Sequence, residues 1–373
     1  RGLGDVYKRQ SEDNVCSMVL FLVDRYAAGP REVLRGRVKA GSPIEYPETG
    51  LYHPRLKGRI STRAKALPAP KDTHRGTIGM LVMRSYALAG NTAHYDAVIT
   101  ALEQRGFRVI PAFASGLDAR PAVNEFFMDE GRPIIDAMLS LTGFSLVGGP
   151  AYNDADAAEE LLASLDVPYV TAQPLEVQSV NQWEDSAQGL TPLESTMMVA
   201  IPELEGATGS IVFGGRYSDG AQDMEPHAER IEMLAGRVAR LATLRRVERA
   251  RRKLAIILFN FPPNAGNTGT AANLEVFSSL YNTLRGLKDQ GYTVELPESV
   301  DALREMVING NASQHGIHAN VHDRIDVDDH VSREPHLAEI EAQWGPAPGK
   351  QLSDGRSIYV LGKQLGNVLI GVQ

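Results

Sequence analysis

Hydrophobic residues in the middle of the chain form short continuous runs, separated by stretches with helical spacing. The runs that we expect to be buried strands are 77–83, 107–113, 134–141, 167–172 and 209–213. Helical spacing occurs between them, at Tyr95, Val98, Ile99 and Leu102, and over 121–129 and 154–165. Continuous apolar strands that alternate with amphipathic helices are typical of a parallel sheet covered on both faces. We therefore predict a doubly wound, mainly parallel α/β domain over 73–252.

Two helices near the end of this domain have clear boundary features. Thr191, Pro192 and Glu194 have the types and spacing of a capping box with proline in the first turn. A long helix over about 226–252 ends in a run of arginines, and basic residues stabilise the carboxyl end of a helix dipole.

The strand and helix pattern starts again at Leu254. We expect a strand at 254–259, a glycine-rich turn, a helix at about 270–288, a strand at 292–296 and a helix at about 299–308. A polar stretch rich in histidine fills 309–336, and strands at 357–361 and 367–372 follow. The pattern predicts the start of a second α/β domain, incomplete over 253–373.

The N-terminal part of the chain is less regular. Residues 11–28 have helical spacing of apolar residues and contain Cys16, so we expect a packed helix that ends at Gly29 and Pro30. Residues 29–72 are rich in proline, glycine and basic residues, so 11–72 is predicted to be a helix followed by a long loop. Residues 1–10 resemble translated adapter sequence, and we expect them to be non-native. Since 367–373 has the pattern of a buried strand with nothing after it, we expect the 373 residues to be an internal part of a longer protein.

Composition narrows the class of protein. With 43% hydrophobic and 23% charged residues the chain is of ordinary globular type, and its net charge of −8 argues against non-specific nucleic-acid binding. A single cysteine excludes an intrachain disulfide scaffold and favours a reducing compartment. The longest apolar run is too short for a transmembrane helix.

Two places could form a ligand site in such a fold. His94 follows the first buried strand of the α/β domain, and ligands of open α/β sheets bind at the carboxyl ends of strands. Residues 141–144 and 148–150 follow a later strand and could line the same crevice, although His94 could equally be a surface or capping residue. The turn 260–270 joins a strand to a helix but lacks the lysine of a phosphate-binding loop. It favours a larger ligand or a packing contact over a nucleotide.

Histidines cluster in the polar stretch. His315, His318, His322, His330 and His336 lie close in sequence to three aspartates, Asp326, Asp328 and Asp329, a donor set that could hold a divalent metal. The alternative is a polar surface insertion, because the segment has few apolar residues to fix ligand geometry and no established zinc spacing.

Five long strings resemble the porphyrin-binding large-subunit family of magnesium chelatase, in its bacteriochlorophyll-pathway form, within the cobaltochelatase large-subunit superfamily. They are IEYPETGLYHP at 44–54, SLTGFSLVGGP at 140–150, FNFPPNAGNTGTAANL at 259–274, AQWGPAPG at 342–349 and GKQLGNVLIGVQ at 362–373. Their order and spacing agree with the family from about residue 11 to the end. His315 and His318 depart from the family pattern, which weakens the metal hypothesis.

The resemblance implies candidate residues. Tyr52, His53, His94, Asn260 and Asn267 match family strings, which makes them candidates for substrate binding. For a metal, only His322, Asp328 and His330 remain as weak candidates. The resemblance places the catalytic residues beyond Gln373, so the chain alone is expected to be inactive.

The resemblance also implies a reaction. Members of the family insert Mg²⁺ into protoporphyrin IX, driven by the hydrolysis of ATP in a separate AAA+ subunit, with a third subunit as a bridge. The implied location is the cytoplasm, including the surface of photosynthetic membranes. Two alternatives stay open: a cobaltochelatase large subunit that acts on a corrinoid precursor, and a non-catalytic two-lobed module that binds a small molecule.

Overall fold

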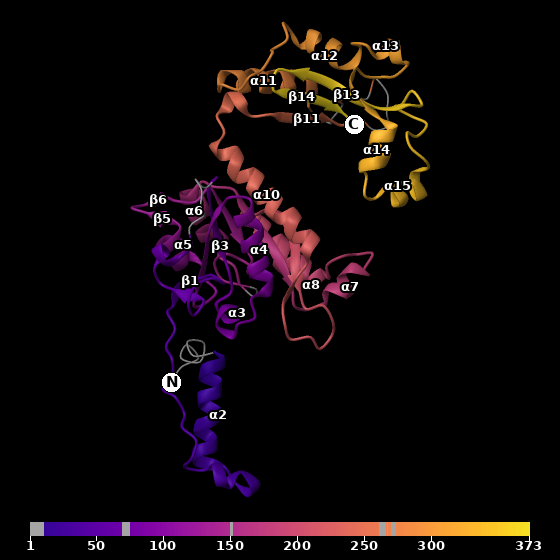
Figure 1. The fold of residues 1–373 in the computed structure, drawn as a ribbon. Helices are drawn as coiled ribbons and strands as arrows, with labels where there is room; N and C mark the ends of the chain where they lie inside the picture. The colour runs from indigo at the N-terminus through magenta and orange to yellow at the C-terminus, as the bar shows by residue number, and fades with distance from the viewer. Residues whose placement is uncertain (1–10, 69–74, 150–151, 261–265, 267, 270–273) are drawn as a thin grey trace. The chain divides into compact units, whose positions relative to one another are not determined.

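The computed structural model describes residues 11–68, 75–149, 152–260, 266, 268–269 and 274–373 (Figure 1). It divides into two compact units, residues 1–246 and 247–373. The boundary lies six residues before the one that the pattern predicts. Residues 1–10, expected to be non-native, and residues 270–273 of an expected helix lie outside the described part.

The first unit is built on an eight-stranded sheet with the order β10-β9-β8-β7-β3-β4-β1-β2. Five strands in its middle are mutually parallel, namely β3 (Thr77–Leu81), β4 (Arg108–Ala114), β7 (Ala137–Ser140), β8 (Tyr169–Leu175) and β9 (Thr208–Gly215). Antiparallel strands complete its edges, namely β1 (Thr49–Tyr52), β2 (Ile60–Ser61) and β10 (Glu225–Pro226). All five strands expected in this unit are present, and the prediction of a mainly parallel sheet is confirmed.

Helices cover both faces of this sheet. Alternate side chains of the strands pack with α4 (Ala93–Gln104) and α10 (Ala228–Arg246) on one face. The remaining side chains pack with α5 (Arg120–Phe126) and α6 (Ala155–Leu165) on the other face (Figure 1). Because each strand is buried on both faces, its sequence is a continuous apolar run. The fold is doubly wound, as predicted.

The order of the parallel strands contains one reversal. Along the chain they run β3, β4, β7, β8, β9, but across the sheet their order is β4-β3-β7-β8-β9. The chain therefore moves to one side of β3 for β4 and to the other side for the next three strands. This is the 2-1-3-4-5 order of doubly wound sheets, and its switch point lies between β3 and β7.

The N-terminal region differs from the prediction in two ways. A helix, α2 (Glu12–Tyr26), is present, but it is not packed: Cys16 is exposed and Val15 is 52% exposed. Asn14 connects this helix to the loop that follows it: its side-chain amide forms two hydrogen bonds with the backbone of Ile44, at 2.7 and 2.8 Å. The expected long loop also contains β1, which pairs with β4 because its apolar side chains complete the core.

Shorter elements complete the first unit. The capping box at Thr191 is present, with hydrogen bonds in both directions between Thr191 and Glu194. The helices are α3 (Arg84–Ala89), α7 (Val180–Glu184), α8 (Pro192–Glu194), α9 (Ile201–Leu204), the 3₁₀ helices η1 (Gly29–Leu34) and η2 (Ala64–Ala66), and the π-helix η3 (Ser195–Ala200). A small hairpin joins β5 (Met128–Asp129) to β6 (Arg132–Pro133).

The second unit contains a mixed sheet with the order β11-β14-β13-β12. Its strands are β11 (Leu254–Leu258), β12 (Val321–Asp326), β13 (Ser357–Leu365) and β14 (Val368–Val372). Its helices are η4 (Arg249–Arg251), α11 (Val276–Asp289), α12 (Val300–Ile308), α13 (Ala312–His315), α14 (Val327–Arg333) and α15 (Leu337–Trp344). Side chains of α11 and α12 pack with those of the strands in one hydrophobic core.

The second unit differs from the prediction in two places. Residues 292–296 do not form a strand; they pass the tight turn between β13 and β14, where the Asn367 amide donates to the Thr293 carbonyl (2.8 Å). The polar stretch 309–336 contains a strand that the pattern does not predict, β12, which pairs with β13. Among the described residues, no helix is long and apolar enough to cross a membrane.

The burial of α10 gives a test of the first unit. Leu234 is fully buried on this helix, whereas Leu244 is 42% exposed. Leu234→Ala should lower the free energy of unfolding of this unit by about 3–5 kcal/mol, since it removes apolar contacts and leaves a cavity. Leu244→Ala on the same helix is the control and should cost less than about 1 kcal/mol. Urea unfolding measures both, and equal losses would contradict the packing described here.

Candidate functional site

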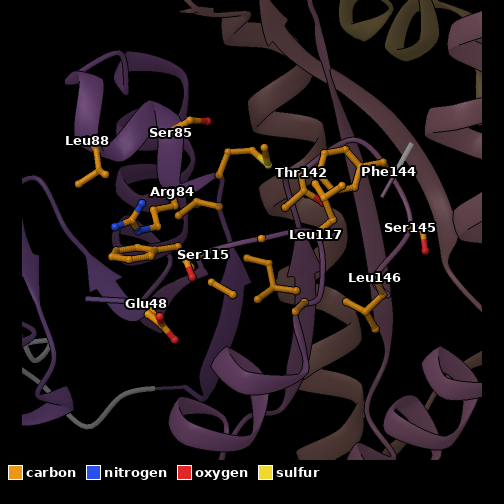
Figure 2. A pocket seen from close by; sticks show the side chains of 17 residues that line it. Glu48, Arg84, Ser85, Leu88, Ser115, Leu117, Thr142, Phe144, Ser145 and Leu146 are labelled. Atoms are coloured by element: carbon orange, nitrogen blue, oxygen red, sulfur yellow. The ribbon is translucent and has the colours of Figure 1, made fainter. Parts of the chain in front are cut away.

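A cavity of about 570 Å³ lies at the switch point of the first unit (Figure 2). Leu81 at the end of β3 pairs with Ala112 of β4 on one side and with Ser140 of β7 on the other, so the three strands end nearly level. The chain leaves β3 toward β4 and leaves β7 toward β8, on the other side of β3, so the segments that follow β3 and β7 must diverge. Residues of the segments after all three strands and of the loop before β1 line the cavity.

The cavity has an apolar floor and a mixed rim. Leu81, Val82, Phe113 and Leu146 line it and are almost fully buried. The side chains nearer the solvent are partly exposed and include apolar and hydroxyl groups: Met83, Ser115, Leu117, Thr142 and Phe144. Figure 2 shows Ser115 and Arg84 on one side of Leu117, and Phe144 and Leu146 on the other.

The two loops that form opposite walls are joined by the backbone. The Ala119 amide donates to the Leu146 carbonyl (3.0 Å), and the Gly148 amide donates to the Leu117 carbonyl (2.9 Å). These bonds connect the loop after β4 with the loop after β7. The cavity therefore has a wall whose backbone is held in one arrangement.

A buried carboxyl group fixes the loop after β7. Glu205, only 3% exposed, pairs with the Ser145 hydroxyl and accepts a hydrogen bond from the Leu146 amide (2.9 Å). Burial raises the pKa of Glu205, and the bonds from Leu146 and Ser145 oppose that rise. Because Ser145 and Leu146 both line the cavity, this carboxyl group sets the position of its wall.

Arg84 anchors the opposite side. Its guanidinium is buried and donates to the carbonyls of Pro47 (3.1 Å) and Tyr46 (3.3 Å). Burial lowers the pKa of Arg84, and the nearby Glu48 carboxylate acts in the other direction. The arginine thus holds the loop before β1 against the first turn of α3. Gly50 in β1 is required by the same packing, since a Cβ there would lie 2.6 Å from the Phe113 ring.

The structure places Tyr52 and His53, two predicted site residues, away from this cavity. Both are buried on or next to β1 and contact α4. The Tyr52 hydroxyl bonds to Asp96, and burial together with this bond raises the pKa of Tyr52. The His53 Nε2 lies 3.2 Å from the Glu103 carboxylate, which also binds Arg55 (2.5 Å). These contacts tie the sheet edge to α4.

His94 is also outside the cavity. It lies in the first turn of α4, is fully buried, and stacks against Tyr95 (3.8 Å between ring centroids) and Phe213 (5.6 Å). Among the described residues, neither ring nitrogen has a hydrogen-bond partner. Burial lowers the pKa of His94 to about 3, so the ring is neutral at physiological pH. Of the residues expected to share one crevice, Thr142 and Phe144 line this cavity and His94 does not.

The remaining predicted residues belong to the second unit. Asn260 is buried after β11 and accepts a hydrogen bond from the Thr268 hydroxyl (3.1 Å), while Asn267 lies outside the described residues. His322 is an exposed residue of β12, and Asp328 and His330 belong to α14. In the described part of the chain, no group of three or more His, Cys, Asp or Glu side chains could hold a metal ion, so the histidine stretch does not assemble as a metal site.

Sequence reasoning did not find the two anchors. Arg84 follows a strand without any motif around it, and Glu205 belongs to a polar helix end that has the composition of a surface segment. The string at 140–150 was the available indication, because it contains Thr142, Phe144, Ser145 and Leu146 of the cavity.

The raised pKa of Glu205 predicts a pH-dependent stability. A carboxyl group whose pKa is higher in the folded than in the unfolded protein stabilises the fold at pH values below its unfolded pKa of about 4.3. This stabilisation is lost as the pH rises through the folded pKa. The free energy of unfolding of native protein should therefore fall more steeply above about pH 4 than that of Glu205→Gln. The free energy of unfolding is measured at each pH from the fluorescence of Trp183 during urea unfolding, in proteins in which Trp344 is replaced by Phe. Glu203→Gln, at an exposed position of α9, is the control. Parallel curves for all three proteins would contradict the burial of an ionisable group here.

Comparisons with known proteins match the chain to part of the subunits of metal chelatases. The family model described as CobN/Magnesium Chelatase matches residues 5–373. The H subunit of the magnesium chelatase of Cereibacter sphaeroides is 50% identical over 380 residues, which cover 97% of this chain and 32% of that protein. The CobN subunit of the aerobic cobaltochelatase of a Sinorhizobium species is 28% identical, over 80% of this chain and 24% of that protein.

A solved structure agrees on the fold. The catalytic subunit of cobaltochelatase from Mycobacterium tuberculosis matches with a TM-score of 0.73 at 24% sequence identity, covering 99% of this chain and 30% of that one. The chain thus spans about a third of the length of the relatives that it matches. Because the family model matches residues 5–373, the chain belongs to the CobN/magnesium chelatase family.

Proposed function

We propose that this chain is part of the large, porphyrin-binding subunit of a magnesium chelatase, which inserts Mg²⁺ into protoporphyrin IX in (bacterio)chlorophyll biosynthesis. The observation that carries the proposal is the 50% identity to the H subunit of the Cereibacter sphaeroides magnesium chelatase over 97% of the chain. Identity to the cobaltochelatase relative is much lower, at 28%, and this favours magnesium over cobalt.

The chemistry of insertion sets what the porphyrin-binding subunit must do. Mg²⁺ gives up its water shell reluctantly, and two pyrrole protons must leave the porphyrin as the metal enters. The protein must therefore hold the macrocycle while bases accept the protons. We assign ATP hydrolysis to a partner AAA+ subunit and a bridging role to a third subunit, in the cytoplasm. This assignment agrees with the sequence, in which the turn 260–270 lacks the lysine of a phosphate-binding loop.

A chimeric protein tests the proposal. In the Cereibacter sphaeroides relative, the matching 380 residues are replaced by this chain. We expect the chimera to insert Mg²⁺ into protoporphyrin IX with its partner subunits, at a rate within about tenfold of the parent, since half of the segment is unchanged and its core is of one fold. The measurement is the fluorescence of the magnesium porphyrin product.

The matched control carries the corresponding segment of the Sinorhizobium cobaltochelatase relative, and we expect it to be inactive with porphyrin. This chain alone with the same partner subunits should also be inactive. A folded chimera that binds a corrinoid precursor but not protoporphyrin IX would refute the proposal in favour of cobalt chelation. Circular dichroism of each chimera establishes that it is folded.

A further inference from the structure

We propose that the switch-point cavity binds the flat, apolar ring system of the porphyrin substrate. The identity of the ligand in this inference rests on the proposed function, whereas the position of the cavity follows from the order and register of the strands. Ligands of open α/β sheets bind outside the carboxyl ends of the strands, where the strand order reverses. Here the level ends of β3, β4 and β7 leave a space of about 570 Å³, within the usual range for small-molecule sites.

The lining favours an aromatic ligand. Phe113 forms part of the buried floor, and Phe144 stands at the partly exposed rim. Leu117, also at the rim, is 45% exposed although it lies between the two walls (Figure 2). A flat apolar ring placed over the floor would cover these side chains and remove their apolar surface from water. Planar ring systems gain further from contact with aromatic faces.

The polar groups of the lining argue against a ligand that would enclose an anionic group, such as a nucleotide. The ring of protoporphyrin IX is apolar, and its two propionates would lie at the open rim, in water. Arg84 is the cation among the described lining residues, and its guanidinium already donates to two backbone carbonyls and lies near the Glu48 carboxylate. The other polar side chains among the described lining residues are the Glu48 carboxylate and the hydroxyls of Ser85, Ser115, Thr142 and Ser145. A phosphate would therefore bring a charge that this cavity does not balance.

The cavity is also held open before any ligand binds. Glu205 fixes the wall at Ser145 and Leu146, and the two backbone bonds described above join the wall to the loop of Leu117. Gly149 leaves room for Leu117, since a Cβ there would lie 2.6 Å from its side chain. A preformed cavity lets a rigid ring bind without the cost of ordering the loops.

Two substitutions in the 373-residue chain test the assignment with protoporphyrin IX as the probe. Ser115→Trp fills the cavity from the rim and should weaken binding at least about tenfold. Phe144→Ala removes one aromatic contact and should weaken binding about fivefold, with less risk to folding because the side chain is only half-buried. Binding is measured from the change in porphyrin fluorescence on titration with protein.

The matched controls are Ser218→Trp, at an exposed position between β9 and β10, and Phe259→Ala, at an exposed position of the second unit. Both should bind the porphyrin as the unchanged chain does. If all five proteins bind equally, the porphyrin lies elsewhere and the inference is refuted, while the proposed function stands. If the unchanged chain does not bind the porphyrin, the inference is likewise refuted, and the chimera decides the proposed function separately.

Discussion

The reversal of strand order at β3 is the constraint on which the first unit depends. A parallel strand buried on both faces needs a helix over each face, and the chain provides α4 and α10 on one face and α5 and α6 on the other. Because β3 takes β4 and β7 as its two neighbours, the connection after β3 runs to one side of the sheet and the connection after β7 runs to the other. No connection can cover the point from which both depart. The cavity is a consequence of this topology, and the side chains around it decide its chemistry.

Buried polar groups then fix the loops around that point. A charged or polar group taken out of water is costly unless it is hydrogen-bonded, so each such group specifies its neighbours. Glu205 requires the Ser145 hydroxyl and the Leu146 amide, and Arg84 requires the carbonyls of Tyr46 and Pro47. Loops are usually the variable part of an α/β fold, but here they are held by bonds from residues distant in sequence. The walls of the cavity are consequently tied to the rest of the unit at Glu205 and Arg84.

The errors of prediction have a common physical origin. Residues 292–296 have the composition of a strand, and α2 has the spacing of a packed helix, yet neither gains the partner that its pattern suggests. The local pattern of a segment indicates which of its side chains can be buried. Which other segment buries them depends on contacts with parts of the chain that are far away in sequence. β1 and β12 were missed for the converse reason. They lie within polar or proline-rich sequence and become strands because β4 and β13 offer them open edges.

The sequence by itself determined the doubly wound class, most of the strands and helices of the first unit, the capping box at Thr191 and the family resemblance. These depend on local periodicity or on contiguous strings, which a sequence displays directly. Only the tertiary structure decided where a ligand could bind, since the cavity is built from four separate segments brought level by the sheet register. It also separated Tyr52, His53 and His94 from that cavity. One sequence motif can contain both a side chain that is buried in the core and a side chain that lines the cavity. The two are distinguished only by the direction in which the folded backbone points each of them.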